Sequence, residues 1–298
     1  MRRKKQPKIL RNITVELKSI TKIPITITPN TTILDASSIL LRYRIGRLVV
    51  EFNKKPVGIV TEKDIARNVS VFSKKPIEKI LVREIMSKDL VTVSPDATTY
   101  ECAKQMKNHG ISSVIIQDTM SKLIGVITKS DLVSTFLVQS TASLNISKIM
   151  TKKVITVSPD DSVFVVQSIL FNNKISRVVV IKNNKPIGII TYRDFIPAKT
   201  FNFHKEFLDP IEKKEVSFGS NLNEFNVNQL SYLLTFSAKD IMTREPFVVN
   251  SNDDVYTAAI LMVRHGISGI PVVNNKKLVG IITKSDIVNV LAAKGKLE

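Results

Sequence analysis

The sequence is poor in cysteine and histidine and has no tryptophan. Cys102 is the only cysteine, and the 298 residues include only three histidines. A lone cysteine excludes disulfides within the chain and zinc sites built from clustered cysteines. His204 has no neighbouring residue that would indicate a metal site, so we expect no bound metal.

Long apolar runs and catalytic motifs are missing too. No stretch approaches the roughly 20 apolar residues that a membrane-spanning helix needs, and no apolar segment of a signal peptide follows the basic start. We therefore expect a soluble, cytoplasmic protein that does not use a membrane. No Walker loop, paired histidine and carboxylate cluster or activated nucleophile occurs, so we expect that the chain is not an enzyme.

The feature that the sequence does have is an internal repeat. Four segments end with Gly-Φ-Φ-Thr-x-x-Asp-Φ, where Φ is apolar, at residues 58–65, 125–132, 188–195 and 280–287. Three repeats also open alike, and in the first we place Ser19-Ile20 at the same position. The three matching pairs are Ile85-Met86, Ile149-Met150 and Ile241-Met242. Four units of roughly sixty residues thus account for most of the chain.

Each unit predicts the order strand, helix, strand, strand, helix. In the second unit, Asp96 is our expected cap for a helix over residues 99–108. Two apolar strands at 111–116 and 123–128 follow, and a helix over 129–138 ends the unit. Because the strands are apolar on both faces, the expected fold is α/β, with small sheets covered by helices.

The recurring Thr-x-x-Asp lies where a strand ends and a helix begins. As a purely structural element it is a capping box, with threonine as the N-cap and aspartate three residues on. As a binding element it offers backbone N–H groups to phosphate and a carboxylate to ribose hydroxyls, while the preceding glycine leaves room for a ligand. Both interpretations are open at this point. The residues are Thr61, Asp64, Thr128, Asp131, Thr191, Asp194, Thr283 and Asp286.

These motifs resemble the repeats of the cystathionine-β-synthase (CBS) domain family, over about residues 10–292 apart from an insertion. The resemblance implies four CBS repeats paired through their sheets into two disc-like modules that bind adenine nucleotides such as AMP, ADP or ATP. It implies that the aspartates hold ribose, with the threonines near ribose and phosphate. A third contact is implied around the second strand, with two phosphate-binding arginines. The matching residues are Arg47, Ser112, Ser176, Arg177 and Ser268.

The repeats set the expected domain boundaries. We interpret His109 and His265 as residues at helix C-termini and Cys102 as a packing residue. The expected regions are a basic arm (1–17), repeats at 18–72, 83–140, 146–199 and 237–292, and an insertion (200–236). The insertion holds six of the thirteen phenylalanines and a predicted helix over 226–236. It is either a linker that packs on the repeats or a docking element for a partner.

Positive charge is unevenly spread along the chain. The net charge is +18, of which +12 lies in residues 1–80 and +6 in residues 146–199. A solvated basic surface is one interpretation, and binding to a polyanion such as structured RNA is the other. The candidate RNA contacts in the arm are Arg2, Arg3, Lys4, Lys5, Lys8 and Arg11.

Three function classes follow from these features. The first is a non-enzymatic sensor of adenine nucleotides. The second is a regulator that docks on rRNA or the ribosome, because the resemblance extends to archaeal four-repeat proteins that act as ribosome-associated dormancy factors. The third is a regulatory subunit of a separate enzyme or transporter. The oligomeric state is open, and a homodimer is one alternative.

Overall fold

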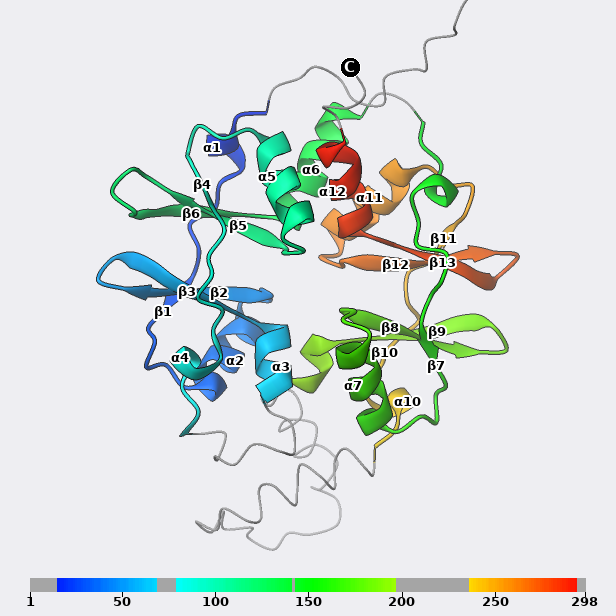
Figure 1. Cartoon of the computed structure of the whole chain (residues 1–298). Coiled ribbons are helices and arrows are strands. Elements are labelled where there is room, and N and C mark those ends of the chain that lie inside the picture. Colours follow the sequence, from blue (N-terminus) through cyan, green and yellow to red (C-terminus); the bar gives the residue numbers. More distant parts are fainter. Residues whose placement is uncertain (1–14, 69–78, 141–142, 197–235, 294–298) are drawn as a thin grey trace, which may run out of the picture. The chain divides into compact units, whose positions relative to one another are not determined.

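The computed structural model describes residues 15–68, 79–140, 143–196 and 236–293, and each repeat in it has the expected order of elements (Figure 1). Repeat 2 is representative. A short strand β4 (Thr92–Val93) runs parallel to β5 (Ser113–Gln117), which pairs antiparallel with β6 (Leu123–Thr128). Helix α5 (Thr99–Asn108) links the first two strands, and α6 (Lys129–Gln139) follows the third. The α/β fold and the four repeats are therefore confirmed.

The other three repeats have the same elements. Repeat 1 contains β1 (Thr26–Ile27), α2 (Ile33–Arg42), β2 (Arg47–Phe52), β3 (Lys55–Thr61) and α3 (Glu62–Asn68). Repeat 3 contains β7 (Thr156–Val157), α7 (Val163–Asn172), β8 (Arg177–Lys182), β9 (Lys185–Thr191) and the 3-10 helix η3 (Tyr192–Phe195). Repeat 4 contains β11 (Val249–Asn250), α11 (Val255–Arg264), β12 (Gly269–Asn274), β13 (Lys277–Thr283) and α12 (Lys284–Ala292).

Local sequence explains most element boundaries. The hairpins of repeats 1, 3 and 4 turn through two residues with positive φ, beginning at Asn53, Asn183 and Asn275. Asparagine tolerates this backbone conformation, which fits the twist of the flanking strands. The expected cap of α5 is wrong: Thr98, not Asp96, caps the helix, because its hydroxyl accepts the N–H of Glu101 at 3.1 Å.

The interpretations of the two histidines and of the cysteine are confirmed. His109 and His265 are the C-terminal caps of α5 and α11. Cys102 is fully buried in α5, and burial raises the pKa of its thiol to about 12. Residues 1–14 of the expected arm (1–17) lie outside the described residues, as do residues 200–235 of the insertion, which include all but the last residue of the helix predicted over 226–236.

The opening segment of each repeat adds a short stretch of backbone to the sheet of another repeat. Ser87, after the Ile85-Met86 pair of repeat 2, exchanges two backbone hydrogen bonds with Ile59 of β3 in repeat 1 (2.9 and 3.0 Å). In return, Lys22 of repeat 1 bridges Val126 of β6 in repeat 2. Repeats 3 and 4 exchange segments in the same way, through Thr151 opposite Ile281 and Thr243 opposite Ile189. Each added segment pairs backbone groups at a sheet edge.

This exchange corrects the alignment of the first repeat. The bridge of Lys22 to Val126 matches that of Ser87 to Ile59, so Thr21 takes the place of Met86. The residues at the Ile-Met position of repeat 1 are thus Ile20-Thr21, and our placement of Ser19-Ile20 was one residue early. The opening helices are α1 (Leu17–Ile20), α4 (Val82–Ile85), η2 (Ile146–Lys148) and α10 (Ala238–Ile241), and β10 (Thr243–Arg244) follows the last.

The exchange also explains the glycine of the motif. A Cβ at Gly280 would lie 2.6 Å from the sulfur of Met150, and one at Gly58 or Gly188 would overlap Met86 or Met242. A Cβ at Gly125 would overlap the methyl group of Thr21. Real Cβ contacts are never this close, so the glycine is needed to seat the opening segment. The space beside it is taken by that side chain, and not by a ligand as we expected.

The chain folds into two compact units, each containing two repeats. The 2/4 unit holds the described parts of residues 1–24, 90–154 and 246–298, and the 1/3 unit holds those of 25–89 and 155–245. In the 2/4 unit, α12 packs against α5 and α6, and α11 packs against α6 (Figure 1). In the 1/3 unit, the two repeats meet where α3 packs against η3.

The two units differ in their cores. One cluster of buried side chains spans both repeats of the 2/4 unit and includes Met106, Phe136, Met262 and Leu291. Among the described residues of the 1/3 unit, repeats 1 and 3 have separate clusters, and Ala66 of α3 is the one residue of repeat 1 in the cluster of repeat 3. None of the helices in the described ranges is both long and apolar enough to cross a membrane.

Candidate functional site

The Thr-x-x-Asp motif forms the same hydrogen-bonded box in all four repeats. In each, Oδ2 of the aspartate accepts one hydrogen bond from the backbone N–H of the threonine and one from its hydroxyl. The N–H distances are 2.9, 2.8, 2.7 and 2.7 Å, and the hydroxyl distances are 2.6, 2.6, 3.0 and 2.7 Å, in repeats 1 to 4. The predicted capping box is confirmed. It uses one carboxylate oxygen and leaves Oδ1 outside the box.

The second strand brings the other candidate residues to the same place. In the antiparallel hairpins Arg47 lies opposite Thr61, and Arg177 lies opposite Thr191. Ser112, Ser176 and Ser268 each come directly before the residue of the second strand that pairs with the box threonine. Two of these serines contact the start of the closing helix through their backbone carbonyls. The carbonyl of Ser112 accepts the N–H of Lys129 at 3.0 Å, and that of Ser268 accepts the N–H of Lys284 at 3.2 Å.

Ser176 holds one of the arginines. Its hydroxyl accepts a hydrogen bond from Nη2 of Arg177 at 3.1 Å. The structure therefore gathers a carboxylate, a threonine hydroxyl and an arginine at the boundary between strand and helix in repeats 1 and 3. Repeats 2 and 4 have Ser113 and Gly269 in place of the arginines.

Burial separates the four aspartates into two classes. Asp131 and Asp194 are 4% and 5% exposed, whereas Asp64 and Asp286 are half-buried. A buried carboxylate needs hydrogen bonds or a counter-charge to offset its desolvation. The box supplies two of these hydrogen bonds in every repeat.

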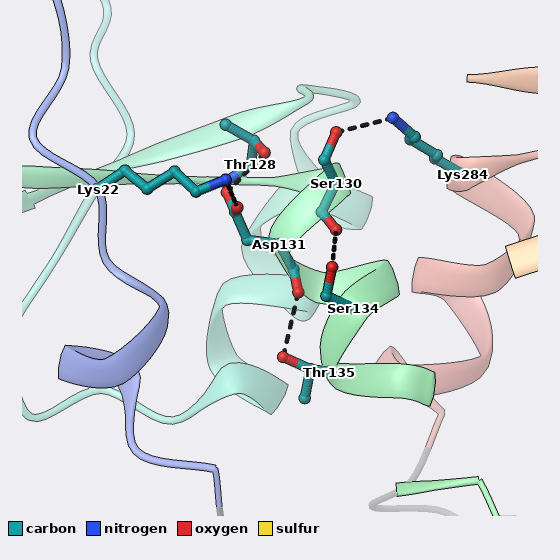
Figure 2. Close-up of polar contacts among 7 residues, drawn as sticks. All are labelled: Lys22, Thr128, Ser130, Asp131, Ser134, Thr135 and Lys284. Carbon is teal, nitrogen blue, oxygen red and sulfur yellow. Dashed lines mark hydrogen bonds and ion pairs between the residues drawn. The ribbon is translucent and has the colours of Figure 1, made fainter. Parts of the chain in front are cut away.

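In the 2/4 unit, the two motifs contact each other reciprocally through the residues between threonine and aspartate. Nζ of Lys129 donates to Oγ of Ser285 at 2.9 Å, and Nζ of Lys284 donates to Oγ of Ser130 at 2.8 Å. Figure 2 shows Lys284 reaching Ser130 from the neighbouring helix. This junction therefore brings two lysines close to the starts of two helices.

The corresponding junction of the 1/3 unit contains an ion pair. Nε of Arg193 lies 2.5 Å from Oε1 of Glu62, which directly follows Thr61. The pKa of Glu62 is raised above its ordinary value, because the effect of burial exceeds the opposite effect of the positive charges of Arg193 and Arg47. The hydroxyl of Tyr192 donates to the carbonyl of Leu170 at 3.2 Å, and burial raises the pKa of this phenol. Sequence reasoning missed these contacts, although Glu62, Tyr192 and Arg193 all lie between the threonine and the aspartate of their motifs.

One further residue was missed altogether. Nζ of Lys22 lies 2.6 Å from Oδ1 of Asp131, the carboxylate oxygen that the box leaves out (Figure 2). The lysine side chain is 68% exposed and the aspartate 4%. Lys22 reaches this position because its backbone bridges Val126, five residues before Asp131.

The arrangement can recognise a diol beside a phosphate. A fixed carboxylate oxygen accepts hydrogen bonds from ribose hydroxyls, and an arginine or lysine near a helix start pairs with phosphate oxygens. No group of three potential metal ligands of the His, Cys, Asp or Glu types occurs within the described ranges. The candidate RNA contacts in the arm lie outside these ranges.

Fold and motif together define a protein built from four CBS domains. The family model for the CBS domain matches residues 16–71, 82–137, 146–199 and 238–293. The chain therefore belongs to the CBS domain family.

Several proteins are similar over most of the chain. MJ1225 of Methanocaldococcus jannaschii is 25% identical over 285 residues, which cover 90% of this chain and 95% of that protein. Its crystal structure matches with a TM-score of 0.79 at 24% identity, over 93% of this chain and all of that one. A crystal structure of an uncharacterised conserved protein from Pyrococcus horikoshii matches with a TM-score of 0.60 at 19% identity, over the same shares.

An enzyme is also among the relatives. The inosine-5'-monophosphate dehydrogenase of Korarchaeum cryptofilum is 26% identical over 229 residues. The match covers 70% of this chain but only 46% of the dehydrogenase. The chain thus corresponds to less than half of that enzyme.

Proposed function

We propose that this chain is a non-enzymatic regulatory protein that binds adenine nucleotides at its Thr-x-x-Asp sites. The observation that carries the proposal is the repeated box, which fixes an aspartate through Oδ2 and leaves Oδ1 outside the box at a helix start. A capping role needs only the oxygen that the box uses. The family resemblance supports ribose as the group that the other oxygen accepts.

The ligand is AMP, ADP or ATP in this proposal, and the residues have distinct roles. The aspartates accept ribose hydroxyls, while the threonines and the serines Ser112, Ser176 and Ser268 line the ribose and phosphate. Arg47 and Arg177 pair with phosphate, because each lies across the hairpin from the threonine of its box. Repeats 1 and 3 are therefore the preferred sites for nucleotides with more phosphate charge.

Calorimetry on ligand-free protein tests this proposal. We expect binding in the micromolar range or tighter, about −8 kcal/mol, for at least one of the three nucleotides. Asp194→Asn keeps the box hydrogen bonds and should cost only about 0.3–1 kcal/mol of folding stability, through the helix dipole. It should weaken nucleotide binding more, because the ribose hydroxyls lose a charged acceptor.

A matched control exists outside the motif. Thr98 and Glu101 form the same kind of box at the start of α5, with 2.7 Å between the backbone N of Thr98 and Oε2 of Glu101. Glu101→Gln should cost similar stability and leave nucleotide binding unchanged. Absence of binding by all three nucleotides would refute the proposal, as would equal losses of affinity and stability across the aspartate variants.

Charge favours a second function, docking on RNA or the ribosome as in a dormancy or hibernation factor. The supporting observation is the net charge of +18, with six lysines and arginines in residues 1–11. Affinity for structured RNA should then fall steeply with salt, by roughly 0.9 in log K per log unit of salt for each phosphate contact on a duplex. Deleting residues 1–11 should make this slope shallower without changing nucleotide affinity. Identical salt curves for both proteins would refute this function.

A third candidate is a nucleotide-sensing subunit of a separate enzyme or transporter. The match to part of a dehydrogenase favours it, because the remainder of that protein lies outside the match. Pull-down from native lysate, with protein and RNA identified together, separates this candidate from RNA docking. A stoichiometric enzyme or transporter without RNA would support the subunit.

A further inference from the structure

We infer that Lys22 closes the site of repeat 2 and makes it differ from the other three. The inference rests on the proposed function, because it concerns which Thr-x-x-Asp sites accept a nucleotide. It assigns to Lys22 the role of a specificity-determining residue that competes with ribose for Asp131.

The four sites differ at the residue that the exchanged segment brings. Lys22 bridges β6 at the position where Ser87, Thr151 and Thr243 bridge the last strands of repeats 1, 4 and 3. A serine or threonine side chain ends at its Oγ, far short of the reach of a lysine Nζ. Only repeat 2 thus receives a long cationic side chain at this position.

Lys22 contacts the oxygen that a ribose would need. In the box of repeat 2, Oδ2 of Asp131 already accepts the N–H of Thr128 at 2.8 Å and its hydroxyl at 2.6 Å. Nζ of Lys22 lies 2.6 Å from the second oxygen, Oδ1 (Figure 2). Ribose hydroxyls are neutral donors, and an ammonium group makes the stronger hydrogen bond to a carboxylate.

The burial of Asp131 strengthens this competition. The side chain of Asp131 is 4% exposed, so little water solvates the carboxylate. Removing Lys22 without a substitute takes away one of the groups that stabilise the buried negative charge. The lysine itself is 68% exposed, so it can swing into solvent when a ligand displaces it. The site is therefore closed by an internal competitor and can be opened without unfolding.

The size of the effect follows from the population of the open state. The apparent dissociation constant rises by the inverse of the fraction of molecules in which the site is open. A hydrogen bond to a charged group corresponds to about tenfold in a binding constant. We expect the repeat 2 site to bind nucleotide about tenfold more weakly than it would without Lys22.

The test is calorimetry of the ligand-free, full-length protein with AMP, ADP and ATP. Lys22→Met removes the ammonium but keeps an unbranched side chain of nearly the same length, and it should add a site or tighten one by about tenfold. Lys22→Arg keeps the positive charge and should bind as wild type. In the Lys22→Met background, Asp131→Asn should abolish the gain.

Three outcomes overturn the inference. If Lys22→Met leaves the number of sites and their affinities unchanged, Lys22 does not close the site. If Lys22→Met weakens binding, Lys22 contacts the ligand directly instead of excluding it. If neither wild type nor Lys22→Met binds any of the three nucleotides, the proposed function fails along with the inference. If the wild type binds nucleotide and Lys22→Met binds it equally well, the inference is refuted and the proposed function still stands.

Discussion

The 2/4 unit and the 1/3 unit are built from the same repeat but hold their two repeats together differently. In the 2/4 unit one hydrophobic core crosses both repeats, and two lysine–serine hydrogen bonds join the motifs. In the 1/3 unit the cores are separate, and the motifs are joined by the ion pair of Glu62 with Arg193. Two of the closing elements differ as well, with 11 residues in the α-helix α6 against 4 in the 3-10 helix η3.

This difference teaches that the repeat fixes where a Thr-x-x-Asp site lies, while residues outside the motif decide which charged groups surround the aspartate. The 2/4 unit has the shared core but no arginine opposite its threonines, and one of its aspartates is paired with Lys22. The 1/3 unit has Arg47 and Arg177 at its sites. If the proposed function holds, we therefore expect the 1/3 unit to bind nucleotides more strongly than the 2/4 unit does.

The largest expected effect tests the shared core. Phe136 is fully buried in the cluster that spans repeats 2 and 4, so Phe136→Ala should destabilise the unit by about 3–5 kcal/mol. Hydrogen exchange should then speed up in α11 and α12 of repeat 4 as well as in repeat 2. Leu170→Ala, in the cluster of repeat 3, should instead leave β2 and β3 of repeat 1 protected. Faster exchange in repeat 2 alone after Phe136→Ala would show that the core is not shared.

The next effect tests the exchanged segments, which both units use. Gly188→Ala places a Cβ against Met242 and should cost about 1–3 kcal/mol through overpacking. Adding Met242→Ala should recover part of this loss, because the shortened side chain makes room. Gly46→Ala is the control, since its Cβ would lie 3.8 Å from the nearest atom, in ordinary contact. Denaturant unfolding of wild type, the three single variants and the double variant measures these losses, and strictly additive losses in the double variant would contradict the packing explanation.

The smallest effect contrasts one carboxylate from each unit. The raised pKa of Glu62 means that the folded state binds its proton more tightly than the unfolded state does. Its contribution to stability is therefore full below the ordinary glutamate pKa of about 4.3 and is lost as the pH rises through the raised value. Glu62→Gln should remove this decline, a change of about 1 kcal/mol or less for a partly exposed pair.

Glu101 of the 2/4 unit should behave in the opposite way. Hydrogen bonds from the backbone and the hydroxyl of Thr98 lower the pKa of Glu101. Its contribution is therefore present above the ordinary pKa and is lost as the pH falls through the lowered value. Unfolding of wild type, Glu62→Gln and Glu101→Gln across the acidic range measures both slopes. The same sign for both residues would contradict the assignment.

Local features of the fold could be predicted from the sequence, and long-range ones could not. The strands, the closing helix after Thr128 and the boxes follow from short-range patterns of apolar residues and caps. The cap at Asp96 was wrong because Thr98 and Glu101 form the better box two residues later. Two caps of similar chemistry so close together cannot be ranked from composition alone.

The exchange of opening segments was invisible in the sequence for a different reason. A bridge such as Lys22 to Val126 joins residues more than a hundred positions apart, and no local preference encodes it. The sequence nevertheless held an indirect sign of the exchange. The motif glycine and the Ile-Met pair recur together, because the methionine side chain occupies the space that a Cβ at the glycine would need. Lys22 could have been found only after the first repeat had been aligned on Ile20-Thr21.

Calorimetric titration of the four single Asp→Asn variants with AMP, ADP and ATP tests the central claim most directly. We predict that Asp64→Asn, Asp194→Asn and Asp286→Asn each weaken or remove one site, that the strongest losses occur in the 1/3 unit, and that Asp131→Asn causes the smallest loss, because Lys22 already competes for its Oδ1. No heat with wild-type protein, or losses of affinity that only follow the losses of folding stability across all four variants, would contradict the account.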